Sequence, residues 1–161
     1  MSTTVYRHPT RDPRETVARA ERAAGLCACA PFRHAFEACL LPLPPGAHWP
    51  LDVPFAVHPD GTTSGVSLCG VFACWCLGLD TRPYVNGAAF AMIRRACMPV
   101  DVPAPGDIIL TDTHARVVVE HVAEYGYLET IEGGQVCLQH GAGHEGRGLQ
   151  AIARKRGTWP A

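Results

Sequence analysis

The chain has 161 residues, of which 47% are hydrophobic and 18% charged, and its formal net charge is −1 at pH 7. This length and balance are typical of one globular domain with a core of its own, here spanning residues 1–161. The near-neutral charge provides no basic field for nucleic acid, and no window of 18 apolar residues exists, so we expect neither a nucleic-acid partner nor a membrane partner.

The amino-terminal residues 1–12 are polar and are predicted to be disordered. They contain no apolar run of seven or more residues, so we expect no secretory signal and synthesis in the cytoplasm. A helix is predicted to begin at Pro13, with Asp12 as its N-cap. Its apolar stripe would comprise Val17, Ala20, Ala24 and Leu26.

Residues 13–63 are predicted to wrap the rest of the domain as a helical and proline-rich segment. A second short helix is predicted in "FRHAFEACLL", residues 32–41. From Pro42 to Gly65 the chain carries six prolines and no periodic pattern, which indicates extended, irregular structure.

The predicted catalytic core, residues 64–157, begins with a helix over Leu68–Leu79. Polar side chains are almost absent from this helix, so we expect it to be buried nearly all round and to end at Gly78. A further helix is predicted in "YVNGAAFAMIRRAC", capped by Asn86, with three residues facing inward: Phe90, Ile93 and Cys97.

After residue 106 the hydrophobic period changes from 3.6 to 2, which is typical of strands. The predicted strands cover residues 107–110, 114–122, 127–132 and 149–156. Their short connections favour an antiparallel meander, and helices followed by such a sheet predict an α+β fold.

The sequence contains eight cysteines, at positions 27, 29, 39, 69, 74, 76, 97 and 137. In a chain without a secretory signal a disulfide framework is not expected, and the two C-x-C pairs lack the usual spacing of zinc knuckles. Most of these cysteines are therefore predicted to be small buried hydrophobes, and we expect no metal site and no cofactor.

Cys69 differs from Cys74 and Cys76 because it falls in the first turn of the predicted helix. The free N–H groups and dipole of a helix N-terminus lower the pKa of a thiol from about 8.5 and favour the nucleophilic thiolate. The deeper two cysteines are predicted to be inert. On position alone, Cys69 as one more core cysteine remains an open alternative.

A cysteine nucleophile needs a base, and His114 at the start of the second predicted strand is the candidate. His121 has the opposite strand parity. In an antiparallel pair, the end of strand 127–132 lies beside the start of strand 114–122, which predicts that Glu132 orients His114. Glu129 differs from Glu132 in parity, so only one of them faces the site. Solvent-exposed roles for His114 and Glu132 are the alternatives.

These segments resemble one known family. "CGVFACWCLG" (69–78) resembles the C-S-G-F-V-A-W-x-L-G helix of NlpC/P60 cell-wall peptidases and the C-x-A-F-V-x-W helix of the related CHAP amidases. "PAPGDIIL" (103–110) and "HARVVVEHV" (114–122) resemble the P-G-D strand and the histidine strand. "IEGG" resembles the CHAP E-G-N corner. The four elements occur in the family's order over about residues 64–135.

The resemblance implies a papain-like fold with Cys69 as nucleophile, His114 as base and Glu132 as the orienting residue. It implies cleavage of amide bonds in peptidoglycan through a thioester acyl-enzyme and without a cofactor, as an endopeptidase or an N-acetylmuramoyl-L-alanine amidase. The expected partner is the peptidoglycan stem peptide. Action at the cell wall would follow lysis, phage delivery or injection, with an immunity, tail or delivery partner.

The chain departs from the family pattern at several positions. Gly70 and Val71 replace the Ser and Gly that follow the cysteine, and Leu68 replaces an aspartate that often precedes it. The Asn of E-G-N is Gly134 here, and Gln135 is the expected stand-in. Two further residues complete the predicted substrate-binding set: Arg116, as a ligand for a stem carboxylate, and Trp75, in register with the family's tryptophan.

Three other functions are compatible with the residues. One is a cysteine amidohydrolase or transferase that acts on an amide outside the cell wall. Another is a non-catalytic phage structural or assembly module. The third is a metal or redox protein built on the C-x-C pairs.

Overall fold

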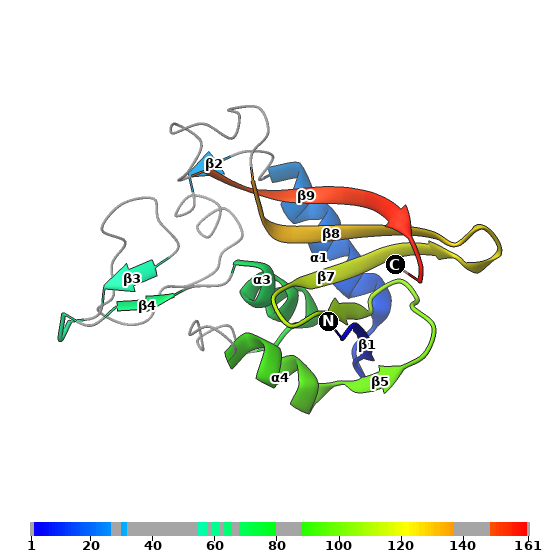
Figure 1. Cartoon of the computed structure of the whole chain (residues 1–161), viewed down its shortest axis with the longest axis horizontal. Helices are drawn as coiled ribbons and strands as arrows, with labels where there is room; N and C mark the ends of the chain where they lie inside the picture. The colour runs from blue at the N-terminus through cyan, green and yellow to red at the C-terminus, as the bar shows by residue number, and fades with distance from the viewer. Residues whose placement is uncertain are drawn as a thin grey trace.

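The computed structural model describes residues 2–26, 30–31, 55–57, 59–61, 63–65, 68–79, 88–136 and 149–160. Its α-helices in this part of the chain are α1 (Pro13–Leu26), α3 (Leu68–Leu77) and α4 (Ala88–Ala96) (Figure 1). None of the helices described is both long and apolar enough to cross a membrane.

The described strands form a seven-stranded antiparallel sheet in the order β2-β9-β8-β7-β6-β1-β5 and a separate hairpin of β3 and β4. Strands β6 to β9 are neighbours in chain order, so the predicted meander and the α+β class are confirmed. The strand bounds are β1 Thr4–Arg7, β2 Ala30–Pro31, β3 Phe55–Val57, β4 Thr63–Gly65, β5 Met98–Val100, β6 Ile108–Leu110, β7 Ala115–Val122, β8 Tyr127–Val136 and β9 Leu149–Thr158.

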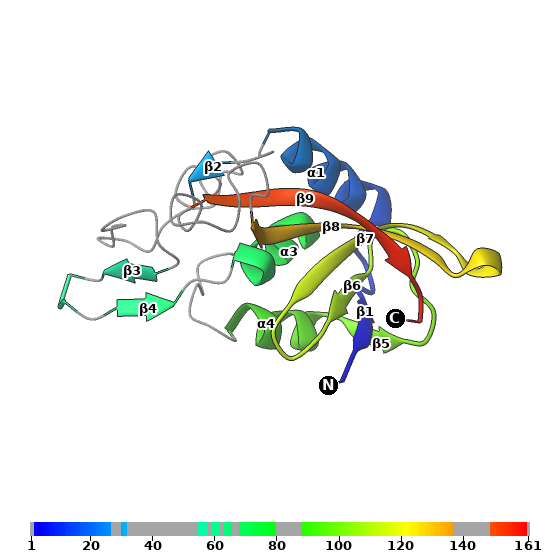
Figure 2. The ribbon, with the colours of Figure 1, turned by 45° about the horizontal axis from the view of Figure 1, so that its top comes forward.

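The main core lies where the three helices meet one face of the sheet (Figures 1 and 2). Helix α3 contacts α1, α4, β7 and β8, so it is surrounded as its apolar sequence predicts. Phe72 and Ala73 are 0% exposed, and Ile93 of α4 and Ile131 of β8 belong to the same larger cluster. Each such large side chain stabilises the fold by about 1.5–3 kcal/mol. A smaller cluster of Val5, Ile109, Val118 and Leu128 is separate from this core.

The predicted disorder of residues 1–12 is wrong. Strand β1 lies between β6 and β5 in the sheet, and its Val5 side chain is 2% exposed (Figure 2). A segment of four residues shows little periodicity in sequence, but pairing on both edges satisfies its backbone groups.

Helix α1 begins at Pro13 as predicted, and Asp12 caps it by accepting a hydrogen bond from the Arg14 backbone N–H at 2.9 Å. Ala20 is buried as predicted, but Thr16 and Ala23 are buried in place of their neighbours Val17 and Ala24. Val17 is only half-buried. Tertiary contacts, and not side-chain hydrophobicity alone, therefore decide which residues of the helix are buried.

The stretch from Pro42 to Gly65 is not wholly irregular, because it contains the β3–β4 hairpin. Strand β5 was also not predicted. It carries Pro99, which lacks an N–H, and a proline is tolerated there because β5 is the edge strand of the sheet. The predicted helix at 32–41 and the predicted cap Asn86 lie outside the described residues.

Candidate active site

The cysteine predicted as nucleophile lies in the first turn of α3, where the helix dipole favours an anion. The Cys69 side chain is 7% exposed, whereas Cys74 and Cys76 are 1% and 0% exposed. Burial raises the pKa of the Cys76 thiol well above its usual value. The helix ends at Leu77, and the next residue, Gly78, has a φ of 74° that is easily adopted only by glycine. All three cysteines belong to the same buried core cluster, and Cys69, in the first turn, is the most exposed of them.

The residue after the cysteine is a glycine because helix α4 packs closely against it. A Cβ atom at Gly70 would lie 2.9 Å from Cε1 of Phe90 and 3.0 Å from Cβ of Ala89. A serine at this position, as in the resembling families, would force α3 and α4 apart. The departure at Gly70 therefore has a packing cause.

The candidate base is held by a tight turn between β6 and β7. The Thr111 backbone N–H donates to the His114 carbonyl at 2.9 Å, and the His114 N–H donates to Thr111 Oγ1 at 3.1 Å. His114 directly precedes β7, so its backbone is anchored to the sheet while its side chain stays 25% exposed.

The candidate orienting residue lies on the adjacent strand β8, beside His114 as the antiparallel register predicts. Nε2 of His114 and Oε1 of Glu132 are 2.7 Å apart. The second carboxylate oxygen accepts a hydrogen bond from Thr130 Oγ1 at 2.6 Å. Glu129, the rejected alternative, instead binds Tyr127, Arg154 and Arg156.

Thr130 is a site residue that the sequence reasoning missed. It is buried two positions before Glu132, so both side chains leave the same face of β8. Strand parity was therefore the available signal. The Thr130 hydroxyl holds the Glu132 carboxylate in position, and this carboxylate in turn orients the His114 imidazole.

His114 also forms a side-chain hydrogen bond with Cys69, and this bond is the largest cause of a His114 pKa of about 9. The hydrogen bond to Glu132 raises the pKa further, whereas burial opposes the shift. Because Nε2 faces Glu132, Nδ1 is the ring nitrogen left for the thiol. Cys69, His114 and Glu132 therefore form one continuous hydrogen-bonded chain.

The carboxylate of this chain is kept ionised. Burial on its own would raise the pKa of Glu132, but hydrogen bonds from His114 and Thr130 and the positive charges of His114 and Arg116 outweigh it. The net result is a Glu132 pKa below its usual value. With a pKa of about 9, His114 is a cation at neutral pH and stabilises a thiolate beside it. The arrangement can carry out nucleophilic attack and then donate a proton to a leaving group.

Arg116, predicted to bind substrate, lies next to Glu132. The register that pairs Val117 with Ile131 sets Arg116 opposite Glu132 on β8. Arg116 lines a pocket of about 270 Å³ together with Glu132 and Lys155, and its Nε is buried with no hydrogen-bond partner among the described residues. The pocket places positive charge directly beside the candidate triad.

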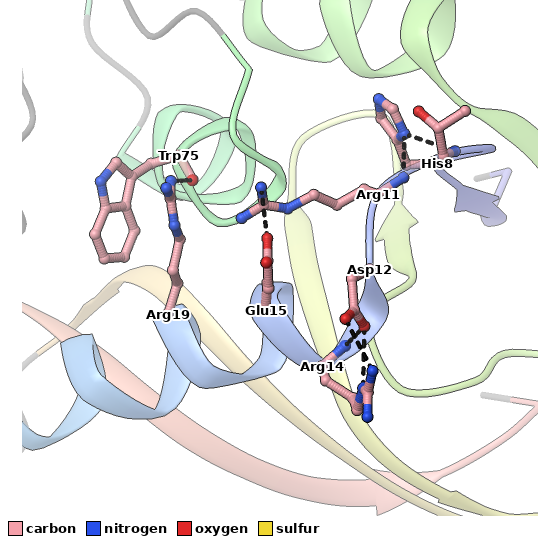
Figure 3. Close-up of polar contacts among 8 residues, drawn as sticks. His8, Arg11, Asp12, Arg14, Glu15, Arg19 and Trp75 are labelled. Carbon is pink, nitrogen blue, oxygen red and sulfur yellow. Dashed lines mark hydrogen bonds and ion pairs between the residues drawn. The ribbon is translucent and has the colours of Figure 1, made fainter.

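Trp75 packs against helix α1 in its described contacts. Its ring stacks on Phe72 with centroids 6.2 Å apart, and the Arg19 guanidinium lies 5.4 Å from the ring centroid. The Trp75 carbonyl also accepts a hydrogen bond from Arg19 Nη1 at 2.7 Å (Figure 3). Six residues after Cys69, Trp75 lies about 120° around the helix and about 9 Å along it. These contacts give it a packing role, and substrate binding by Trp75 stays a prediction.

Gly134 and Gln135 belong to β8, where the pairing with β9 is irregular between Glu132 and Gln135. The structure does not describe the surroundings of these two residues' side chains, so their substrate-binding roles stay predictions. His121 is not part of the hydrogen-bonded chain, because its Nδ1 contacts the Pro103 carbonyl at 2.8 Å.

In the described part of the chain, no group of three or more His, Cys, Asp or Glu side chains is arranged to hold a metal ion. The first C-x-C pair, Cys27 and Cys29, lies outside that part. Cys74 and Cys76 of the second pair are buried, and Cys74 Sγ donates a hydrogen bond to the Ala89 carbonyl at 3.5 Å. Comparison of the chain with protein-family models, curated proteins and solved structures found no match.

Proposed function

We propose that this chain is a cysteine hydrolase with a papain-like fold of the NlpC/P60–CHAP kind, and that it cleaves amide bonds in peptidoglycan. The observation that carries the chemistry is the chain of hydrogen bonds from Cys69 through His114 to Glu132, which starts at a helix N-terminus. The substrate class rests on the resemblance of four ordered motifs to cell-wall hydrolases.

The proposed reaction begins with the ion pair of the Cys69 thiolate and the His114 imidazolium. The thiolate attacks the amide carbonyl, and the backbone N–H of Cys69 donates to the oxyanion. His114 then protonates the leaving amine, so that the C–N bond breaks and a thioester remains. A water molecule, deprotonated by His114, hydrolyses the thioester and restores the thiolate. Glu132 and Thr130 keep the imidazole in position throughout.

The substrate-binding part of the proposal assigns the positive pocket of Arg116 and Lys155 to a carboxylate of the stem peptide. The pocket adjoins Glu132, and Arg116 has a buried Nε without a hydrogen-bond partner in the described residues. Gly134 and Gln135 follow Glu132 on the same strand and complete the proposed subsite. The enzyme would reach the wall after cell lysis, on a phage particle or by injection.

The test is to incubate the purified protein with isolated peptidoglycan and to identify the soluble products by mass spectrometry. We expect stem-peptide fragments or free stem peptides whose ends name the cleaved bond. The Cys69→Ala variant should lose activity by about a thousandfold or more. Cys74→Ala is the matched control, because Cys74 lies deeper in the same helix and its Sγ contacts the Ala89 carbonyl; it should retain activity if folded.

Two results would redirect the proposal. If several wall types yield no fragments while Cys69 reacts rapidly with iodoacetamide at neutral pH, the substrate is an amide outside the wall. The triad geometry supports acyl transfer on either substrate. If Cys69 also reacts no faster than an ordinary thiol, the protein is a non-catalytic module and the hydrolase proposal is wrong.

A further inference from the structure

Strand β1 fills a slot between β5 and β6, so it has a paired strand on each side (Figure 2). Val5 lies opposite a residue of each neighbour, and its side chain packs with Ile109 in the smaller core cluster. Arg7, at the end of the strand, donates two hydrogen bonds to Asp107, at 2.9 and 2.8 Å. The described strand partners of β1 thus all come from residues 98–110.

The walls of this slot are attached to the rest of the sheet independently of β1. Strand β6 pairs with β7 on its other side, and the loop that joins β5 to β6 is bonded to β7 as well. In that loop the Gly106 N–H donates to the Val118 carbonyl, and the Val118 N–H donates to the Asp107 carbonyl, both at 2.9 Å. The Pro103 carbonyl lies 2.8 Å from Nδ1 of His121 on β7. The slot therefore does not need β1 to hold its walls, and without β1 it would expose two strand edges.

A short hinge, residues 8–12, connects β1 to helix α1. Its bend is held by one side chain, because Nδ1 of His8 accepts hydrogen bonds from the N–H groups of Thr10 at 3.2 Å and Arg11 at 3.0 Å (Figure 3). None of the five hinge residues is buried. Fully extended, five residues span up to about 17 Å. The hinge therefore directs β1 back to its own chain when bent and can carry it to another chain when straight.

The slot requires particular side chains from the strand that fills it. Asp107 is 2% exposed, so an occupant without a cation at that position would leave a buried carboxylate without its partner, which is costly. The position beside Ile109 requires a small apolar side chain, which β1 supplies as Val5, two residues before Arg7. A second copy of β1 meets both requirements with the register already observed.

We propose that this slot accepts β1 from a second copy of the chain, so that two chains form a dimer by exchanging their first strands. Each sheet of the dimer has the same pairing as in the single chain. The exchanged strand also reaches the candidate site, because Ser2 donates to Asp112 at 3.3 Å in the turn that holds His114. Each chain thus places a residue beside the His114 turn of the other. This inference does not rest on the proposed hydrolase activity.

The first experiment refolds the full chain from urea at low and high protein concentration, with a reductant present so that cysteines cannot link the chains. Size-exclusion chromatography with light scattering then measures the mass. We expect a dimer whose fraction grows with the concentration during refolding. Concentrating the folded monomer without urea should give little dimer, because β1 must first leave its slot. Monomer alone after every refolding, or a dimer that forms equally well without unfolding, overturns the proposal.

A charge-reversal pair identifies the strand that fills each slot. Arg7→Glu and Asp107→Arg each place like charges together within one chain. In an exchanged dimer of one variant with the other, each slot again pairs an acid with a base. Refolding the two variants together should therefore give about tenfold more dimer, or more, than refolding either alone. The chain with both changes regains the pair by itself and should refold like the unchanged chain, which controls for folding. Equal amounts of dimer in the mixture and in the separate variants overturn the proposal.

A shorter hinge gives a test that leaves Asp107 unchanged. Deleting Pro9 and Thr10, which are both exposed, shortens the reach of the hinge by about 7 Å, so that β1 no longer returns to its own slot. We expect this variant to be a dimer that unfolds cooperatively in urea. The matched control replaces the same two residues by alanine, keeps the hinge length and should refold mainly as a monomer at low concentration. A folded monomer or an unfolded chain after the deletion overturns the proposal.

Discussion

His114 owes its character to the two side chains on either side of its ring. The Cys69 sulfur, as an acceptor, and the carboxylate of Glu132 both favour the imidazolium, and together they outweigh the effect of burial, so the pKa of His114 is about 9. The proposed reaction needs this proton to expel the amine. Attack on a small alkylating reagent needs only the thiolate. The two chemistries should therefore respond differently to high pH.

We predict that kcat/KM for amide hydrolysis falls as the pH rises above about 9, whereas the rate of Cys69 alkylation by iodoacetamide does not fall. Glu132→Gln removes the anion that stabilises the imidazolium, so it should move the fall in kcat/KM to lower pH by about one unit or more. Glu120→Gln, which changes an exposed carboxylate on β7, should leave the profile unchanged. An unmoved profile in Glu132→Gln would contradict the assigned role of this carboxylate.

The positions of the three triad residues could be predicted from the sequence because each lies on, or directly beside, an element with a clear sequence pattern. Cys69 begins an apolar helix, and Glu132 lies near the register position of His114 in a meander with short turns. The packing around these three residues was harder to predict from the sequence. The contact of Gly70 with Phe90 depends on how α3 and α4 cross, and the local sequence carries no signal of that crossing angle.

At the scale of elements, the contact between α3 and α4 limits the size of the residue that can follow Cys69 in the sequence. We predict that Gly70→Ser lowers the free energy of unfolding by about 1–3 kcal/mol, because the new side chain overlaps Phe90. Phe90→Leu in the same chain should recover part of this loss. A double-mutant cycle in urea checks the prediction, and strictly additive effects of the two changes would show that the clash is absent.

The loop Pro105–Asp107, which carries the P-G-D motif, has a structural task in this fold. Gly106 has a φ of 92° and leaves no room for a Cβ beside Pro13. We predict that Gly106→Ala costs about 2 kcal/mol or more of unfolding free energy. Gly157→Ala is the matched control, because nothing lies within 4 Å of its added Cβ, and it should change stability by less than about 0.5 kcal/mol. Equal effects of the two changes would refute this account.

The elements missed by sequence reasoning are the short ones. β1, β3, β4 and β5 have three or four residues each, and their stability comes from partners elsewhere in the chain. Period-based reasoning needs a longer window, which explains why α3, α4, β7 and β9 were identified and these strands were not. Strand β6 (Ile108–Leu110) is equally short, but its apolar run directly after a proline–glycine turn marked it in the sequence. In α1 the buried stripe includes Thr16 because packing against α3 and the sheet, rather than hydrophobicity alone, decides which face turns inward.

For the whole molecule, buried carboxylates connect the layers and make stability depend on pH. Glu129 of β8 binds Arg154 and Arg156 of β9, and Arg154 also binds Glu21 of α1. A hydrogen bond from Tyr127, together with those from the two arginines, lowers the pKa of Glu129. With Glu132, the fold therefore contains two carboxylates that bind a proton less readily when folded than when unfolded.

We predict that the free energy of unfolding decreases as the pH falls below about 4.5, the ordinary value for glutamate. The sign follows from linkage: the unfolded chain takes up protons first, and the stabilisation present above that pH is lost as the pH falls through the lower folded-state pKa values. Urea unfolding between pH 3 and 7 measures the slope. The Glu129→Gln, Glu132→Gln double variant should have a shallower slope over this range, and an unchanged slope would assign acid sensitivity to other groups.

The place of β1 in the sheet has a consequence for synthesis on the ribosome. Arg7 pairs with Met98, and Val5 pairs with Ile109, so a newly made β1 waits for partners about a hundred residues later in the chain. At translation rates of about 5–20 residues per second, this wait lasts roughly 5–20 s. During that time the nascent sheet cannot be completed, and Val5 stays exposed to other chains. Slowing translation before residue 98 should therefore lower the soluble yield, whereas slowing it after residue 110 should not.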